Sequence, residues 1–311
     1  MTVPDSGGDG TGGLDRIATS DGTFAIVAMD QRNTLRRMYT AAGRTPDHDD
    51  MVALKADIAR ALSPSASALL VDPDLGVPAL AGDGVLAPGC GVLVAAEPAE
   101  KQSWQGEPRA ARDPALDAAW VRGHGGDALK FLVQLRVGRP HRAGGPDLVE
   151  ELLEVVRAVV SDCRAAGVPS VVENLVYRLP GEDVLAGDAR AEAVVESARL
   201  LDGLGCDLLK LEYPGSPTAC RRLADAVTGP WAVLSAGVAF DDFLDAVRVS
   251  CDEGGASGFI AGRAFWKEAV ALDGPQRAPF LSEHGRSRLD ACVAALAGRA
   301  RPWREARRSP E

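Results

Sequence analysis

The stretch DLVEELLEVVRAVVSDCRAAGVPSVVENLVY, residues 147–177, has the pattern of a helix followed at once by a buried strand. Asp147 and Glu150 form a capping-box pair at the start of the expected helix, and apolar residues then recur at helical spacing up to Gly167. The run SVVENLVY (170–177) is almost continuously apolar, which is typical of a strand covered on both faces of a parallel sheet. The segment therefore predicts one helix and one strand of an α/β fold.

Other short runs along the chain have the same apolar character and raise the predicted number of strands to eight. They are Phe24–Met29, Ala68–Val71, Gly91–Ala95, Ala128–Gln134, Asp207–Glu212, Trp231–Ser235 and Gly258–Gly262. Strands that alternate with helices over about 250 residues favour a closed (β/α)8 barrel, the TIM-barrel architecture of the α/β class. A doubly wound open sheet is the alternative, but no G-x-G-x-x-G motif follows the first strand.

The chain divides into a barrel and two terminal segments. Residues 1–15 are rich in Gly and Asp and predict a disordered N-terminal tail, and residues 16–283 form the barrel. Residues 284–311 carry seven arginines against three acids, and we expect an Arg-rich C-terminal helix or tail, solvated and frayed at its end. Residues 97–126 read as a long loop with a helix near 114–122.

Composition limits the classes of function. The 311 residues are 46% hydrophobic and 25% charged, which excludes a disordered chain, a coiled coil and a disulfide-stapled miniprotein. The formal net charge of −10 argues against a nucleic-acid partner, and no apolar run approaches the ~20 residues that span a membrane. The six cysteines are scattered, without a C-x-x-C motif or a preceding signal peptide, so we expect reduced thiols and a cytoplasmic protein. The four histidines are isolated, and we expect no metal site.

Three predicted strands each contain an ionisable residue, Lys130, Glu173 and Lys210, although the chain has only five lysines. A charge inside a strand costs several kcal/mol unless its side chain faces the open catalytic end of the barrel. Burial and a neighbouring cation both lower the pKa of a lysine, and a neutral amine can form a Schiff base with a carbonyl. Glu173 would then exchange protons with the substrate hydroxyl. The alternative is that both lysines only form ion pairs with strand-end carboxylates.

The last two predicted strands end in small residues directly before a helix, with Ser235 and Gly237 after one and Gly262 and Arg263 after the other. Barrels of this kind commonly bind phosphate with the loops that follow strands 7 and 8, and an arginine adds a charged fork. Glycines at strand ends are also ordinary turn residues. Together with the strand lysines, this pattern predicts a phosphorylated carbonyl substrate.

The sequence resembles the class I tagatose-1,6-bisphosphate aldolases and the related sulfofructosephosphate aldolases. The resemblance runs in order over roughly residues 20–270. It rests on the segments AMDQR (28–32), LLVDPDLGVP (69–78), GVLVAAE (91–97), LKFLVQLR (129–136), VPSVVENLVY (168–177), CDLLKLEYPG (206–215), PWAVLSAGV (230–238) and ASGFIAGRAFW (256–266). The sequence departs from the expected family pattern at Pro98–Lys101 and at Gln134–Arg136. Its segment GASGF (255–259) is closer to the sulfofructosephosphate aldolases.

The resemblance implies a metal-independent aldolase without a cofactor. Lys210 would be the Schiff-base lysine, Glu173 the general acid/base, and Lys130 a neighbour that contacts substrate and tunes the pKa. Further residues would bind the substrate, with Asp30, Gln31 and Arg32 lining the pocket and Ser235, Gly237, Gly262 and Arg263 holding a terminal anion.

The expected reaction is the reversible cleavage of a ketose 1-phosphate to dihydroxyacetone phosphate and an aldehyde. The far end of the ketose would carry a phosphate, as in tagatose or fructose 1,6-bisphosphate, or a sulfonate. Two alternatives stay open: another lysine-dependent aldolase, such as the deoxyribose-phosphate type, and a regulator that binds sugar phosphates without turnover. The expected partner is a small sugar phosphate, and by analogy with other barrels the chain is expected to form a homo-oligomer.

Overall fold

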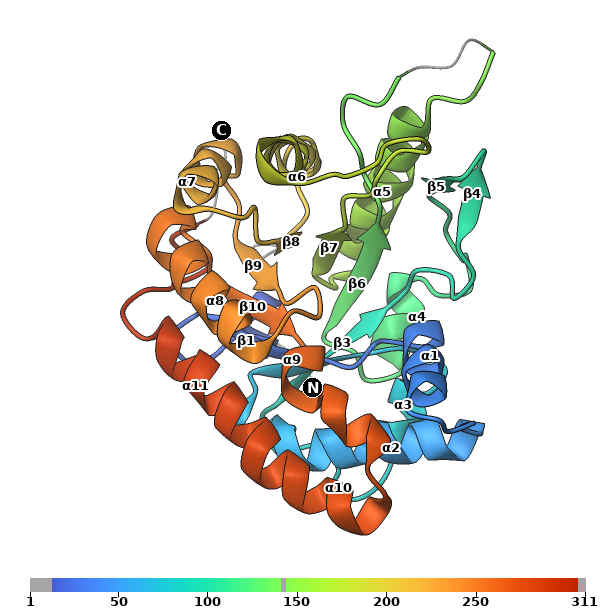
Figure 1. The fold of residues 1–311 in the computed structure, drawn as a ribbon, viewed down its shortest axis with the longest axis vertical. Coiled ribbons are helices and arrows are strands. Elements are labelled where there is room, and N and C mark those ends of the chain that lie inside the picture. Colours follow the sequence, from blue (N-terminus) through green and yellow to red (C-terminus); the bar gives the residue numbers. More distant parts are fainter. Residues whose placement is uncertain (1–12, 141–143, 307–311) are drawn as a thin grey trace, which may run out of the picture.

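The computed structural model describes residues 13–140 and 144–306, and its central strands close into a parallel eight-stranded barrel (Figure 1). The barrel strands are β1 (Phe24–Ala28), β2 (Ala68–Val71), β3 (Gly91–Ala95), β6 (Ala128–Val133), β7 (Ser170–Asn174), β8 (Leu208–Glu212), β9 (Trp231–Leu234) and β10 (Gly258–Ala261). They neighbour one another in chain order, and β10 pairs with β1 to close the sheet. The predicted (β/α)8 barrel is confirmed, and the open sheet is excluded.

Helices surround the barrel on its outer side (Figure 1). The longer ones are α1 (Asn33–Ala41), α2 (His48–Leu62), α5 (Leu148–Ala166), α6 (Gly187–Asp202), α7 (Pro217–Ala226), α8 (Phe240–Gly254) and α11 (Arg286–Leu296). Short helices are α3 (Gly76–Leu80), α4 (Ala118–Gly123), α9 (Arg263–Trp266) and α10 (Gly274–Phe280). Within the described ranges, none of the helices combines the length and the apolar character needed to cross a membrane.

Helix α5 begins and ends close to where its sequence predicts. The Asp147 carboxylate accepts hydrogen bonds from the backbone N–H groups of Val149 and Glu150, and Gly167 ends the helix with a left-handed φ of 65°. The predicted capping box is only half formed, because the Glu150 carboxylate pairs with Arg157 at 2.8 Å. An N-terminal aspartate and a C-terminal glycine therefore define the helix between β6 and β7.

The interior of the barrel positions the charged strand residues. Ala128, Val171 and Leu208 belong to the apolar cluster inside the barrel. Lys130, Glu173 and Lys210 each lie two positions further along the same strands, so strand alternation directs them to the same inner face. The strands are parallel, and all three side chains therefore lie one layer closer to the carboxyl end of the barrel.

The opposite end of the barrel is filled by residues from both ends of the chain. Trp303 is only 2% exposed and joins the interior cluster together with Leu14 and Ile17. Its backbone N–H donates to the Gly22 carbonyl at 2.8 Å. Apolar side chains therefore close the amino end of the barrel, and the carboxyl end is the end that carries the charged residues.

The expected C-terminal helix is present as α11, but the described part of residues 284–311 stays packed after this helix and does not fray. Helix α11 packs against α2 and α8, and the chain after it stays buried at Trp303 and Ala306. The expected N-terminal tail lies outside the described residues up to residue 12, and Leu14 is buried. These contacts join segments from opposite ends of the sequence, which local patterns do not reveal.

The segment after β3 contains a hairpin that its sequence did not predict. Strands β4 (Gln102–Trp104) and β5 (Glu107–Arg109) pair antiparallel and stand beside the carboxyl ends of β3 and β6 (Figure 1). Glu107 is buried and accepts two hydrogen bonds from Arg139, at 2.7 and 2.8 Å, and one from the Tyr177 hydroxyl at 2.9 Å. This ion pair fixes the hairpin to the loops that follow β6 and β7.

Candidate active site

The three charged strand residues meet at the carboxyl end of the barrel. The Lys210 Nζ lies 2.9 Å from the Glu173 Oε2, and the Lys130 Nζ lies 2.7 Å from the same oxygen. Glu173 is directly opposite Lys210 in the register of β7 and β8. One buried carboxylate is therefore shared by two buried lysines on its two neighbouring strands.

Lys130 contacts two further carboxylates. Its Nζ lies 2.8 Å from the Asp30 Oδ2 and 2.7 Å from the Glu97 Oε1. Burial by itself would lower the pKa of Lys130, but the charges of Asp30, Glu173 and Glu97 raise it well above its ordinary value of 10.5. Lys130 is thus held as a fixed cation. This is the reverse of the direction that burial alone predicts for a strand lysine.

Lys210 has a different electrostatic environment. Among the described residues, Glu173 is the only carboxylate that forms an ion pair with it. Burial would raise the pKa of Glu173, but Lys130 and Lys210 together lower it. The Lys210 ammonium is therefore balanced by one carboxylate, which it shares with Lys130. Of the two lysines, Lys210 is the one with fewer acidic partners among the described residues.

Asp30, Gln31 and Arg32 follow β1 and support the acids around Lys130. The Gln31 Nε2 donates to the Asp30 Oδ1 at 3.1 Å, and the Arg32 Nη2 donates to the Glu97 carbonyl at 2.9 Å. The Gln31 Oε1 is buried and has no hydrogen-bond partner among the described residues. These contacts orient Asp30 and Glu97, and they leave one buried acceptor beside the cluster.

The predicted anion-binding residues lie at the ends of β9 and β10. Gly237 has a φ of 85°, and a Cβ at this position would lie 2.9 Å from the Arg263 Cζ, so only glycine allows the guanidinium to lie there. Arg263 is half-buried, and its guanidinium has no ion pair or hydrogen bond with residues 13–140 or 144–306, although its backbone carbonyl accepts a hydrogen bond from the Lys267 N–H. Ser235 is buried beside this loop. An uncompensated arginine at the open end of the barrel suits an anionic ligand.

Gly262 has a packing role in this region. A Cβ at Gly262 would lie 1.7 Å from the Ala28 carbonyl oxygen, so this glycine allows β10 to approach β1. Gly262 therefore allows the barrel to close, whereas the guanidinium of the next residue, Arg263, is available to an anionic ligand.

Two acids at the strand ends, the half-buried Glu97 and the buried Asp72, were not predicted. Glu97 follows β3, and Asp72 follows β2 and forms a fully buried ion pair with Lys55. Asp72 also accepts hydrogen bonds from the backbone N–H groups of Leu75 and Gly76, at 2.9 and 3.1 Å. Because these acids come directly after apolar strands, their position at the carboxyl ends of the strands was the signal that could have identified them.

The lowered pKa values predict how stability depends on pH. The pKa of Glu173 lies below its ordinary value of 4.5, and that of Asp30 lies below 3.8, so both groups stabilise the fold fully above these values. Their contribution is lost as the pH falls toward the folded-state pKa. The contribution of Lys130, whose pKa is raised, is complete below 10.5 and is unaffected by acid.

We therefore expect the free energy of unfolding to fall steeply below about pH 4.5, and Glu173→Gln to make that fall shallower. Urea unfolding from pH 6 to pH 3, followed by circular dichroism, measures both slopes. Parallel curves for the two proteins would show that Glu173 carries no lowered pKa.

The part of the chain that the structure describes contains no group of three or more His, Cys, Asp or Glu arranged to hold a metal ion.

Comparisons with known proteins identify the family and the fold of the chain. The model of a family described as DeoC/LacD family aldolase matches residues 24–268. A tagatose 1,6-diphosphate aldolase 2 of Streptococcus pyogenes serotype M3 is 27% identical over 322 residues, which cover 92% of this chain and 94% of the relative. An archaeal fructose 1,6-bisphosphate aldolase superposes with a TM-score of 0.61 at 18% identity, covering 92% of this chain and 100% of the other. A Schiff base forming fructose-1,6-bisphosphate aldolase gives a TM-score of 0.61, also at 18% identity, covering 91% and 100%.

Proposed function

The chain belongs to the DeoC/LacD family of aldolases, and from this premise we propose that it cleaves a ketose 1-phosphate through a Schiff base on Lys210. The observation that carries the proposal is the unequal compensation of the two strand lysines. Lys130 contacts three carboxylates, whereas Lys210 shares only Glu173 among the described residues. A lysine held by three acids cannot act as a nucleophile, because its lone pair is occupied by a proton.

The proposed reaction begins when Lys210 transfers a proton to Glu173 and its amine attacks the C2 carbonyl of the ketose. Glu173 returns this proton to the carbinolamine hydroxyl, which leaves as water, and the iminium ion forms. Glu173, again as carboxylate, takes the proton from the C4 hydroxyl, the C3–C4 bond breaks, and the aldehyde leaves. The enamine is then protonated at C3 and hydrolysed to release dihydroxyacetone phosphate. Lys130 provides a fixed positive charge beside Glu173 throughout.

The C1 phosphate is proposed to bind at the ends of β9 and β10. Arg263 offers a guanidinium that no acid among the described residues neutralises, and Gly237 leaves the space in which it lies. Ser235 adds a hydroxyl at the same strand end. Strand β9 is the direct neighbour of β8, which supports a phosphate site next to the carbon that reacts with Lys210.

For the other end of the ketose we propose an anion as well, a phosphate as in tagatose or fructose 1,6-bisphosphate or a sulfonate as in 6-deoxy-6-sulfofructose 1-phosphate. The name of the S. pyogenes relative supports the bisphosphate. The GASGF segment (255–259), which is closer to the sulfosugar branch, supports the sulfonate.

Reductive trapping tests the proposal. Sodium borohydride added together with dihydroxyacetone phosphate should reduce the iminium and leave a stable adduct on Lys210, located by peptide mass spectrometry. Glycerol 3-phosphate, which lacks the ketone, is the matched control and should leave none. An adduct found only on Lys130, or no adduct at all, would overturn the assignment.

A further inference from the structure

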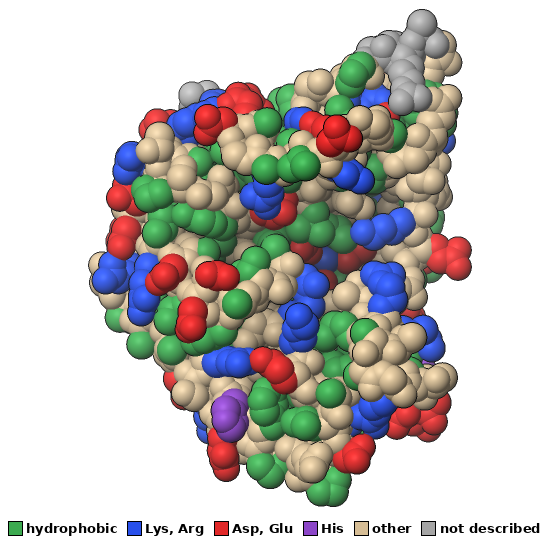
Figure 2. Space-filling model, viewed as in Figure 1, with side chains coloured by type: hydrophobic (Ala, Val, Ile, Leu, Met, Phe, Trp, Pro, Cys, Tyr) green, Lys and Arg blue, Asp and Glu red, His purple; other side chains and the backbone are tan. Residues whose placement is uncertain are grey.

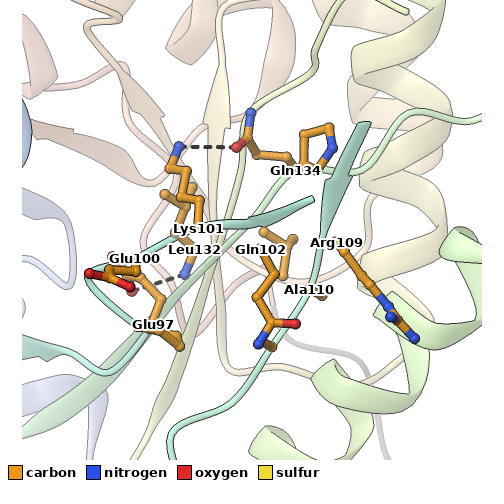
Figure 3. Close-up of a pocket in the computed structure, with 12 residues that line it drawn as sticks. Glu97, Glu100, Lys101, Gln102, Arg109, Ala110, Leu132 and Gln134 are labelled. Atoms are coloured by element: carbon orange, nitrogen blue, oxygen red, sulfur yellow. Dashed lines mark hydrogen bonds between the residues drawn. The ribbon is translucent and has the colours of Figure 1, made fainter. Parts of the chain in front are cut away.

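A pocket opens beside the charged cluster, between the segment after β3, strand β5 and the end of β6 (Figure 3). Its wall includes Glu97, Lys101, Leu132 and Gln134. Glu97 links this pocket to the cluster, because one carboxylate oxygen contacts the Lys130 Nζ at 2.7 Å and the other accepts from the Leu132 N–H at 3.1 Å. In the space-filling view, Lys, Arg, Asp and Glu atoms lie at the bottom and rim of a hollow in this face (Figure 2).

Lys101 is the cation of this pocket that lacks an acidic partner. Its Nζ donates to the Gln134 Oε1 at 3.0 Å, and no carboxylate among the described residues forms an ion pair with it. Arg109, the other cation in the pocket wall, is held by Glu151 at 2.8 and 2.9 Å. Figure 3 shows the Lys101 amine directed toward Gln134 and the Glu100 carboxylate directed away from it. The Lys101 ammonium therefore keeps donors for a ligand.

The electrostatic environment places Lys101 at the edge of the active cluster. Lys101 is exposed, and its pKa is lowered by desolvation and by the charge of Lys130, against the opposite effect of the carboxylates of Glu97 and Glu173. These groups are close enough to act on Lys101 although none of them pairs with it. A ligand that reaches from Glu173 toward the pocket would therefore meet this ammonium.

The order of the strands matches the order of the atoms in the proposed substrate. Around the barrel, Arg263 after β10 is followed by Ser235 after β9, Lys210 on β8, Glu173 on β7 and Lys130 on β6, and the next strand is β3. A ketose with its C1 phosphate at Arg263 and its C2 on Lys210 presents C4 to Glu173. Its C5 and C6 then point toward the side of the barrel where the chain after β3 carries Lys101.

We propose that Lys101 is a specificity-determining residue that binds the terminal anion on the aldehyde half of the substrate. This inference rests on the proposed function and assigns the far end of the same site. A phosphate and a sulfonate share the chemistry that Lys101 recognises, namely a tetrahedral anion that accepts charge-assisted hydrogen bonds.

The test compares two sugars that differ only at the far end. For Lys101→Gln, kcat/KM for tagatose 1,6-bisphosphate should fall by about 10- to 100-fold, mainly through KM, because a charge-assisted hydrogen bond is lost. For tagatose 1-phosphate, the loss should stay below about 3-fold, since the contact is absent in the wild type. Lys267→Gln makes the same charge change at an exposed residue outside the pocket and is the matched control.

The arms of the experiment separate the possible outcomes. Equal losses for both sugars, or no loss for either, would overturn the role of Lys101 while wild-type cleavage and the adduct on Lys210 keep the aldolase proposal intact. A wild type that cleaves no ketose phosphate would overturn both. Repeating the comparison with 6-deoxy-6-sulfofructose 1-phosphate identifies the anion. Of this sugar and tagatose 1,6-bisphosphate, the one that the wild type cleaves better should show the larger loss of kcat/KM in Lys101→Gln.

Discussion

Lys210→Met is expected to lower kcat for ketose cleavage by about 10⁴-fold or more, equivalent to about 5 kcal/mol of transition-state free energy. Without the amine, neither the carbinolamine nor the iminium can form, and the reaction loses its electron sink. Coupled-assay detection of triose phosphate measures the rate, and borohydride trapping should yield no adduct. The fold should persist, because Glu173 keeps its contact with Lys130 at 2.7 Å.

Lys267→Met is the control for the loss of a lysine, since Lys267 is exposed and follows the short helix α9. It should retain wild-type activity and the adduct. Cleavage by Lys210→Met within tenfold of the wild type would show that another residue is the nucleophile.

Glu173→Gln is expected to lower kcat by about 10²- to 10⁴-fold, the range typical of a lost general acid/base. Glutamine preserves the size of the side chain but cannot take the proton of the C4 hydroxyl. The variant should still give a borohydride adduct with dihydroxyacetone phosphate, because the amine of Lys210 is present. Cleavage and trapping should therefore separate, which a general loss of folding would not produce.

Glu97→Gln offers a matched comparison for this prediction. Glu97 also contacts Lys130, at 2.7 Å, but forms no ion pair with Lys210. Its replacement should reduce cleavage much less than Glu173→Gln. If the two variants lost activity equally, the carboxylates would act as one charge cluster, and Glu173 would have no individual role in proton transfer.

The fold was predictable because its strands are short, apolar and regularly spaced. All eight barrel strands coincide with apolar runs of the sequence, and each ends within three residues of its predicted limit. The hairpin at residues 102–109 was missed because its two strands have three residues each and contain exposed Gln102, Ser103 and Arg109, which leaves no periodic apolar signal. Local sequence patterns identify the elements that form the core, and they miss short elements that lie outside it.

The candidate site was predictable only in part. Lys130, Glu173 and Lys210 stand out because charges are rare inside buried strands, and the structure brings them into contact. The direction of the pKa shift of Lys130 was not accessible, since it depends on acids that follow β1 and β3 as well as on Glu173. These acids are distant from Lys130 in the sequence, and they act on its pKa only after the chain has folded.

The position of Trp303 has a consequence for biosynthesis. The floor of the barrel needs this residue together with Leu14 and Ile17, so its packing joins the earliest and the latest translated parts of the described chain. Strands β1 and β10, whose pairing closes the barrel, likewise cannot pair until the last third of the sequence has been synthesised. A nascent chain that does not yet include β10 and Trp303 therefore exposes an unfinished apolar interior, and the barrel can close only after these residues have been synthesised.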